Sequence, residues 1–187
     1  GDRDGLPEWG YDEELELGSL GRIQLSSTTR RRLALTEAGI TENDGSDTIF
    51  NEQTSTLEQN SVALGSMLAL DTECLALIAS GMGLTNEAEQ LRERHQRLRE
   101  LINKRLWDEG SGSYVDRRWS GQPLHQVTPG NLLPLAAGLP DAAKTSRLVS
   151  ALRQMLGSPS TLERTSFPVN YLLYLGLRRS NLRAEAT

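Results

Sequence analysis

The sequence predicts an all-α protein whose helices are joined by long irregular loops. Apolar residues recur at spacings of three, four and seven after Gln59, a pattern typical of an amphipathic helix. A second helical pattern follows Thr85, and a nearly continuous apolar run follows Pro168. Long loops between helices are where helical enzymes usually carry their sites, so this organisation favours an enzyme over a plain bundle.

Two long helices are expected in the middle of the chain. The first runs from about residue 59 to the glycines at 81 and 83. Its apolar stripe, expected to face the core, consists of Leu64, Met67, Leu68, Leu75, Ile78 and Met82. The second follows Thr85, a candidate N-cap, and its apolar face consists of Ala88, Leu91, His95, Leu98, Ile102 and Leu106. Because His95 lies within an apolar row, we interpret it as a residue at the edge of the core and not as a metal ligand.

The remaining elements are shorter. Residues 1–27 show no sustained period, residues 28–36 predict a short helix that begins at Thr28 or Thr29, and residues 106–121 predict a loop or a small hairpin. Thr128 and Pro129 begin another helix, residues 141–156 form the next, and the run after Pro168 predicts a helix buried on most sides. We expect one domain with two parts, a loop-rich segment at 1–58 and helical hairpins at 59–187.

Composition limits the classes of function. The chain has 25 acidic and 20 basic residues among 187 and a net charge of -5, which argues against nucleic acid or an anionic membrane as a partner. We expect no membrane span, because a run of apolar residues of the necessary length is not evident, and we expect a cytoplasmic protein. Cys74 is the only cysteine, expected to be a small buried apolar residue, and His95 and His125 are the only histidines. No metal site is expected from so few ligands.

Several segments resemble the catalytic domain of glycosidases related to glycoside hydrolase family 63, especially the mannosylglycerate-hydrolase-like group. They follow one another in the family's order: DRDGLPEWG at 2–10, TEAGIT at 36–41, DTIFNEQTSTLEQNSVALGSMLALDTECLALIA at 47–79, INKRLWDEGSGSYVDR at 102–117, TPGNLLPLAAGLP at 128–140 and FPVNYLLYLGLRR at 167–179. The resemblance therefore extends over nearly the whole chain.

The resemblance implies an (α/α)₆ toroid, in which pairs of helices surround a central pocket. About six helices are expected here, half of the twelve that a closed ring of this kind implies, so we expect about half of a toroid. A second chain or a missing segment would complete the barrel. The resemblance also implies hydrolysis of an α-linked glycoside or oligosaccharide that contains glucose or mannose, with inversion and without a cofactor.

An inverting glycosidase needs a carboxylic acid and a carboxylate base, roughly 6.5 to 9.5 Å apart. In the register of the resemblance, the acid position falls on Thr41, whose hydroxyl cannot serve as the proton donor. Three alternatives remain open: Asp44 or Glu42 supplies the acid from a shifted loop, Asp12 supplies it, or activity is lost. The order of the motifs favours Asp44 and Glu42, although this composition is also that of a solvated turn. The family's late base has no counterpart, so we expect it outside these residues.

Substrate contacts are expected from aromatic and polar side chains near these carboxylates. Sugar subsites usually combine an aromatic platform with polar groups, and Trp9, Tyr11 and Trp119 are the candidate platforms. Glu37 takes the position of a family glutamate in the resemblance. Trp107 ends an apolar helix face, so we expect it to fill the core. The alternative function is a noncatalytic helical domain, derived from such an enzyme, that binds carbohydrate or another protein.

Overall fold

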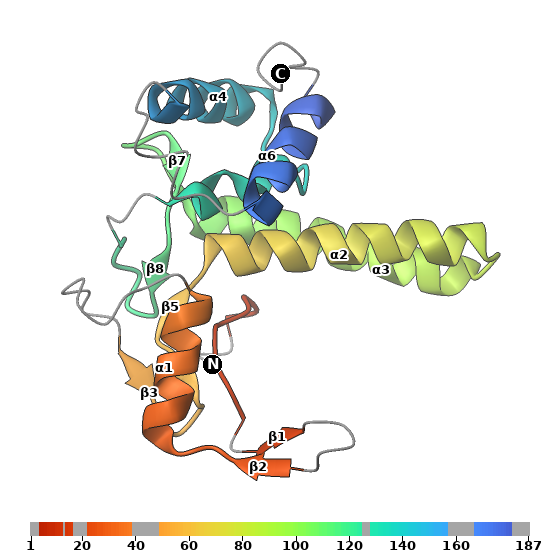
Figure 1. The fold of residues 1–187 in the computed structure, drawn as a ribbon. Helices are drawn as coiled ribbons and strands as arrows, with labels where there is room; N and C mark the ends of the chain where they lie inside the picture. The colour runs from red at the N-terminus through yellow and green to blue at the C-terminus, as the bar shows by residue number, and fades with distance from the viewer. Residues whose placement is uncertain are drawn as a thin grey trace. The chain divides into compact units, whose positions relative to one another are not determined.

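The computed structural model describes residues 4–12, 14–16, 22–38, 49–124, 128–156 and 167–180 (Figure 1). The chain forms two compact units. The first unit contains residues 1–61 and 117–122, and the second contains residues 62–116 and 123–187. Over the described residues, the structure is mostly helical with short pairs of strands, so the helical class is confirmed at this coarser level.

The first unit contains one helix and three antiparallel strand pairs among its described residues. The helix begins one residue earlier than expected, because the Ser26 hydroxyl accepts a hydrogen bond from the Thr29 N–H at 3.2 Å and caps it. The elements are α1 (Ser27–Glu37), β1 (Glu14–Glu16) with β2 (Arg22–Gln24), β3 (Phe50–Asn51) with β4 (Thr56–Leu57), and β5 (Gln59–Asn60) with β8 (Arg117–Arg118).

The chain segment around Gly10 lies alongside β4. The Leu57 N–H donates to the Trp9 carbonyl at 2.7 Å, and the Tyr11 N–H donates to the Ser55 carbonyl at 3.0 Å. Gly10 lies between these two bonds, and a Cβ there would be 2.7 Å from the Thr56 Cγ2, so only glycine fits this close approach. The contact joins the N-terminal segment to a small apolar cluster of Ala34, Leu35 and Leu57, around which Trp9, Tyr11, Ala38 and Phe50 pack.

The second unit is built on a helical hairpin. Helix α2 (Val62–Gly81) packs along α3 (Thr85–Arg105), and both helices were expected. Thr85, however, is the first helical residue, and the cap position belongs to Leu84, which makes no capping side-chain bond. The other elements are the hairpin β6 (Trp107–Asp108) with β7 (Ser113–Tyr114), the 3₁₀ helix η2 (Pro129–Leu135), α4 (Ala142–Leu156) and α6 (Phe167–Arg179).

The orientation of α2 differs from the sequence-based expectation. Its buried face consists of small residues: Val62, Gly65, Ser66, Ala69, Thr72, Ala76 and Ala79. Four residues of the expected core stripe are instead exposed, namely Met67, Leu75, Ile78 and Met82. Cys74 is exposed as well, so its expected burial was wrong. Small residues form the interface of α2 with α3 because they allow the two helices to approach closely. A Cβ on Gly65 would lie 3.3 Å from the Ile102 Cδ1.

Helix α2 is also long and apolar enough to cross a membrane, with a mean hydropathy of 1.7, contrary to our expectation that no run approached this length. About 39% of that window is buried inside the protein. A core helix of a soluble protein meets the same criteria of length and composition, and α2 carries Asp71 and Glu73 near its middle. The helix is therefore weak evidence for a membrane.

The turn after η2 is held by side chains from α3 and α6. His95 Nε2 lies 3.3 Å from the Ala137 carbonyl oxygen, and Arg99 Nε and Asn103 Nδ2 donate to the Leu139 carbonyl at 3.1 and 2.7 Å. Arg179 donates to the Ala136 carbonyl at 3.3 Å. These side chains thus donate to carbonyl groups that follow the end of η2 and that have no partner within a helix. His95 is half-buried, which confirms its place at the edge of the core.

Trp107 fills the space between the β6–β7 hairpin and α4, as expected. It is buried, and its ring meets that of Tyr114 edge-on at a centroid distance of 5.0 Å. From α4, Lys144 Nζ and the Arg147 guanidinium lie 5.5 and 5.3 Å from the Trp107 ring centroid. The indole is therefore a structural element of the second unit.

Candidate functional site

The structure connects the N-terminal segment to the end of α1. Tyr11 donates its hydroxyl hydrogen to Glu37 Oε1 at 3.2 Å. Burial, and then the hydrogen bond to Glu37, raise the pKa of Tyr11 above its usual 10.0. Helix α1 ends at Glu37, so this bond holds the point from which the chain enters residues 39–48. Glu42 and Asp44 belong to that segment and lie outside the described residues.

The other predicted residues of the N-terminal segment have different surroundings. Trp9 and Tyr11 both pack against the cluster formed by Ala34, Leu35 and Leu57, so part of each ring serves to hold the first unit together. Asp12 follows Tyr11 directly and is exposed. The structure thus brings Trp9, Tyr11 and Glu37 to one cluster. Their roles toward a substrate, and that of Asp12 as an acid, stay predictions.

Trp119 lies elsewhere in the first unit, beside a small cavity of about 130 Å³. The pairing of β5 with β8 places it there, and the backbone N–H of Trp119 donates to the Glu58 carbonyl at 3.3 Å. The Glu58 carboxylate accepts a hydrogen bond from Asn51 Nδ2 at 2.9 Å. The cavity is lined by Ile49, Glu58, Gln59, Arg118, Trp119 and Ser120.

The indole N–H of Trp119 is buried and has no hydrogen-bond acceptor among the described residues. Sequence reasoning identified Trp119 as a platform but missed Glu58 and Arg118 on the same cavity. No local signal could have found them, because β5 and β8 are separated by more than fifty residues and pair only in the fold.

Asp116 is a second residue that sequence reasoning did not single out. Its carboxyl group is largely enclosed, and burial raises its pKa from the usual 3.8 to about 6. Its Oδ1 accepts a hydrogen bond from the Val62 N–H at 2.7 Å, which acts in the opposite direction on the pKa. This bond satisfies a free N–H in the first turn of α2. Perturbed carboxylates occur at functional sites and in structural networks alike, and here the geometry supports the structural role.

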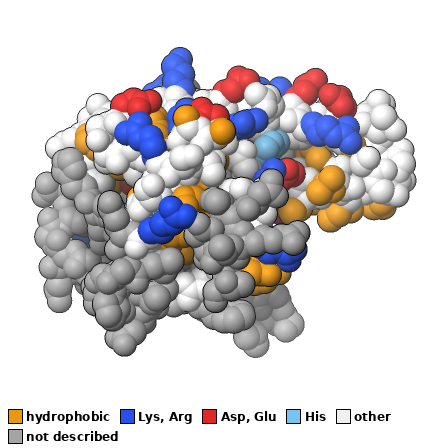
Figure 2. All heavy atoms as spheres, turned by 90° about the horizontal axis from the view of Figure 1, so that it is seen from above, with side chains coloured by type: hydrophobic (Ala, Val, Ile, Leu, Met, Phe, Trp, Pro, Cys, Tyr) orange, Lys and Arg blue, Asp and Glu red, His pale blue; other side chains and the backbone are white. Residues whose placement is uncertain are grey.

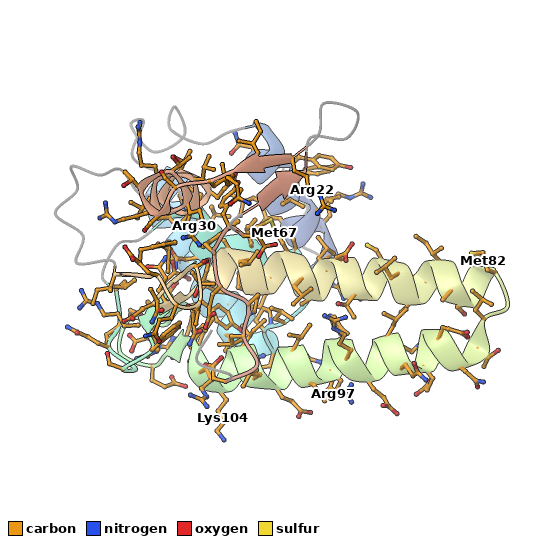
Figure 3. All side chains as sticks on the ribbon, turned by 90° about the horizontal axis from the view of Figure 1, so that it is seen from below. Arg22, Arg30, Met67, Met82, Arg97 and Lys104 are labelled. Carbon is orange, nitrogen blue, oxygen red and sulfur yellow. The ribbon has the colours of Figure 1, made fainter. Side chains whose placement is uncertain are left out.

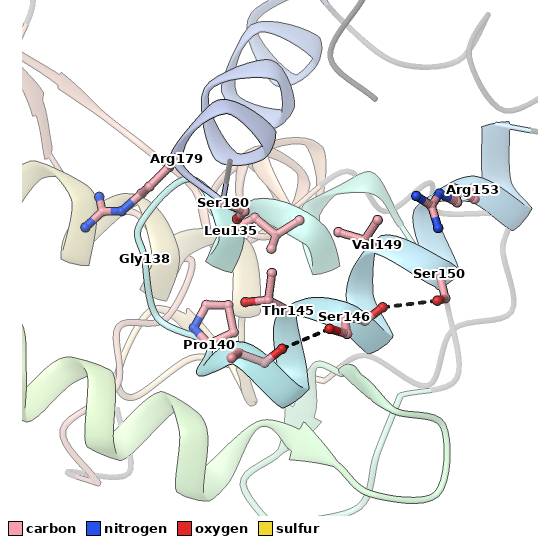
Figure 4. Close-up of a pocket in the computed structure, with 11 residues that line it drawn as sticks. Leu135, Gly138, Pro140, Thr145, Ser146, Val149, Ser150, Arg153, Arg179 and Ser180 are labelled. Atoms are coloured by element: carbon pink, nitrogen blue, oxygen red, sulfur yellow. Dashed lines mark hydrogen bonds between the residues drawn. The ribbon is translucent and has the colours of Figure 1, made fainter. Parts of the chain in front are cut away.

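A larger hollow lies in the second unit between α4, α6 and the turn after η2, with a volume of about 600 Å³ (Figure 4). No carboxylate lines it among the described residues. Its serine hydroxyls at positions 146 and 150 donate to carbonyls one turn earlier in α4, shown as dashed lines. None of the described residues predicted for catalysis or binding lines this hollow, and the described side chains give it no carboxylic acid or carboxylate base.

No group of three or more histidine, cysteine, aspartate or glutamate side chains could hold a metal ion within the described part of the chain. Among the described carboxylates of the first unit, Glu37 and Glu58 each accept a side-chain hydrogen bond, from Tyr11 and Asn51.

Comparison with solved structures relates this fold to glycosidases. The GH63 mannosylglycerate hydrolase of Thermus thermophilus in complex with Tris superimposes with a TM-score of 0.60 and 22% identity, over 72% of this chain and 36% of that chain. The same hydrolase in complex with glucose gives the same score and identity. The neutral trehalase of Saccharomyces cerevisiae superimposes with a TM-score of 0.57 and 17% identity, over 68% of this chain and 29% of that chain.

These similarities concern the fold, and the chain spans about a third of the length of those enzymes. A family model gives a stronger relation, because it is matched by residues 11–174, most of the sequence. The matched region includes Tyr11, Glu37, Glu58 and Trp119. The chain therefore belongs to the mannosylglycerate hydrolase MGH1-like glycoside hydrolase domain family.

Proposed function

We propose that this chain is part of an inverting glycoside hydrolase that acts on an α-linked glycoside or oligosaccharide containing glucose or mannose. The observation that carries the proposal is the family match over residues 11–174. The contact between Tyr11 and Glu37 supports it, since it holds the start of the segment that bears Glu42 and Asp44. In this proposal Asp44 or Glu42 protonates the leaving oxygen, with Asp12 as the alternative acid, and the base comes from outside these residues.

The test is hydrolysis of mannosylglycerate and of trehalose, the substrates named for the two similar enzymes, by a purified protein that contains these residues together with the segment or second chain that supplies the base. NMR during the first turnovers would identify the anomer released and hence inversion. We expect one of D44N, E42Q and D12N to lower the rate by at least about a hundredfold, the smallest loss typical of a removed general acid. E89Q, on the exposed face of α3, is the matched control. Equal rates in all four variants would refute the assignment of the acid.

A second function, a noncatalytic helical domain that binds carbohydrate or another protein, is favoured by one observation. Leu77 and Met82 are 68% and 69% exposed, and Leu75 and Ile78 lie beside them on α2. Exposed apolar surface of this kind usually marks an interface. In this function, sugar binding persists without hydrolysis, and all three carboxylate variants bind as the unaltered chain does.

A further inference from the structure

The outer face of α2, opposite the small residues that pack on α3, is apolar and exposed to water. Met67, Leu75, Ile78 and Met82, which follows the last residue of the helix, are 37%, 44%, 57% and 69% exposed. Their spacings of eight, three and four place them on one side of the helix. Figure 3 shows Met67 and Met82 near the two ends of the helix. The face is about 22 Å long at roughly 1.5 Å per residue, long enough to contact four turns of a second helix.

Asp71 is the one charged residue in the middle of this outer face. It lies one turn from Met67 and one turn from Leu75, is exposed, and has no ion pair or hydrogen bond among the described residues. Helix α2 contains no basic residue, and its other carboxylate, Glu73, is bonded to Arg179. Covering Asp71 without a cation would remove the water around a charge at a large cost. A stable occupant of the face must therefore bring a positive charge to Asp71.

We propose that the outer face of α2 binds an amphipathic helix of a partner protein, which sets its apolar residues along the face and one lysine or arginine opposite Asp71. A helix docks on such a surface through side chains one and two turns apart, and this spacing matches that of the exposed residues. Flexible methionine side chains at both ends of the face adapt to the shape of the partner. The proposal goes beyond hydrolysis, because none of the residues proposed for catalysis belongs to α2.

A second copy of this chain fits the face only weakly. In an antiparallel pair of α2 helices centred between Cys74 and Leu75, Asp71 of each copy would face Ile78 of the other. In a parallel pair the two Asp71 carboxylates would lie side by side. Both arrangements cover a carboxylate without supplying a cation. A lipid surface fits no better, since anionic headgroups repel Asp71 and hydrocarbon cannot hydrate it.

The test is the binding of two synthetic helical peptides to the purified chain, measured by fluorescence anisotropy. Both peptides are as long as the outer face and carry leucines at helical spacing, and they differ only in the central residue, which is arginine in one and glutamate in the other. We expect the arginine peptide to bind saturably. The glutamate peptide should bind at least about thirtyfold more weakly, the usual loss when a covered charge lacks its partner. Asp71→Asn should remove most of this preference, and Asp71→Lys should reverse it.

The matched control is Glu89→Gln, which removes an exposed carboxylate from α3 and should keep the preference for the arginine peptide. Ile78→Lys should weaken both peptides and so locate them on the outer face. Circular dichroism checks the fold of every variant, and if Asp71→Lys does not fold, Asp71→Asn decides. The proposal is overturned if the arginine peptide does not bind or if Asp71→Asn keeps the full preference. Two further results would also overturn it, by assigning the face to another occupant: a dimer of the chain that excludes the peptide in sedimentation, or binding to phosphatidylcholine vesicles that Ile78→Lys abolishes.

Discussion

Helices α2 and α3 belong to one hairpin but expose opposite kinds of surface. Helix α3 turns its apolar residues to the core and its charged residues outward, with Arg97 and Lys104 pointing away from the hairpin (Figure 3). Helix α2 buries small residues and exposes large apolar ones, which gather along one edge of the hairpin (Figure 2). An amphipathic helix facing water would do the reverse. Helix α3 therefore has a polar face suited to water, whereas both faces of α2 consist mostly of residues suited to burial.

The largest effect is expected where the two helices meet. Ile102 on α3 is 0% exposed and lies against Gly65 of α2. Ile102→Ala leaves a cavity that the small residues of α2 cannot fill, and should lower the free energy of unfolding by about 2 to 5 kcal/mol. Urea denaturation measures it. The control is Leu77→Ala on the exposed side of α2, where about 0.5 kcal/mol or less is expected. Equal losses in the two variants would contradict the assigned orientation of α2.

A second prediction concerns the first turn of α2. Asp116 has its pKa raised by burial from 3.8 to about 6, so the folded state binds a proton more tightly than the unfolded state. Stability is therefore highest at low pH for this group, and falls as the pH rises from about 4 to about 6, by roughly 3 kcal/mol at most. Asp116→Asn keeps an acceptor for the Val62 N–H and removes the charge. We expect it to raise the free energy of unfolding at pH 7.5 and to flatten this pH dependence.

A lower stability of Asp116→Asn at pH 7.5 would contradict this prediction. It would mean that the charge of the carboxylate stabilises α2 by more than its burial costs. Thermal unfolding at several pH values between 4 and 7.5 distinguishes the two outcomes. The matched control is Asp71→Asn at an exposed position of α2, which should not remove the fall in stability between pH 4 and pH 6.

The sequence predicted where α2 and α3 lie but not which face of α2 is buried. The spacing of Met67, Ile78 and Met82 defines a helical stripe, and periodicity assigns the larger apolar residues to the core. That rule fails when small residues such as Gly65 and Ala69 allow close approach of a neighbouring helix, a property set by the partner. The Trp119 cavity and the cap by Asp116 could not be predicted for the same reason, since both depend on contacts between distant segments. Tyr11 and Glu37 were singled out because the family resemblance marked their segments, and their roles toward a substrate stay predictions.

A third prediction uses a carboxylate whose pKa moves in the opposite direction. Arg179 of α6 donates to both oxygens of Glu73 at 2.6 and 2.7 Å, and this hydrogen bonding, against partial burial, lowers the pKa of Glu73 below 4.5. The stabilisation that the ionised Glu73 gives the folded state is therefore fully present above pH 4.5, and it is lost as the pH falls through the lowered pKa. Glu73→Gln should cost about 1 kcal/mol at pH 7, a small value because both side chains are partly exposed to water.

The measurement for Glu73 is the difference in free energy of unfolding between the variant and the unaltered chain at pH 7 and at pH 3. We expect the difference to be smaller at pH 3, because the advantage of the carboxylate is lost as the pH falls through its lowered pKa. A difference that is undiminished at pH 3 would show that the glutamine disturbs packing and that the ion pair is not its cause. Asp116 bonds to the first turn of α2 and Glu73 lies near the middle of the helix. Because the two carboxyl groups affect stability in opposite directions as the pH changes, the two single variants distinguish the contribution of the first turn from that of the middle.

The smallest effect on stability, and the most direct test of the comparison, is expected on the exposed face of α2. Ile78→Lys places a charge among the exposed apolar residues and should change the free energy of unfolding by about 0.5 kcal/mol or less. If that face is composed for contact, the same change should reduce self-association in sedimentation and binding of a hydrophobic dye. Ser80→Lys adds an equal charge on α2 without removing apolar surface, so it controls for charge alone. Equal effects of both variants would mean that repulsion, and not the apolar face of α2, governs association, and α2 and α3 would then differ only in composition.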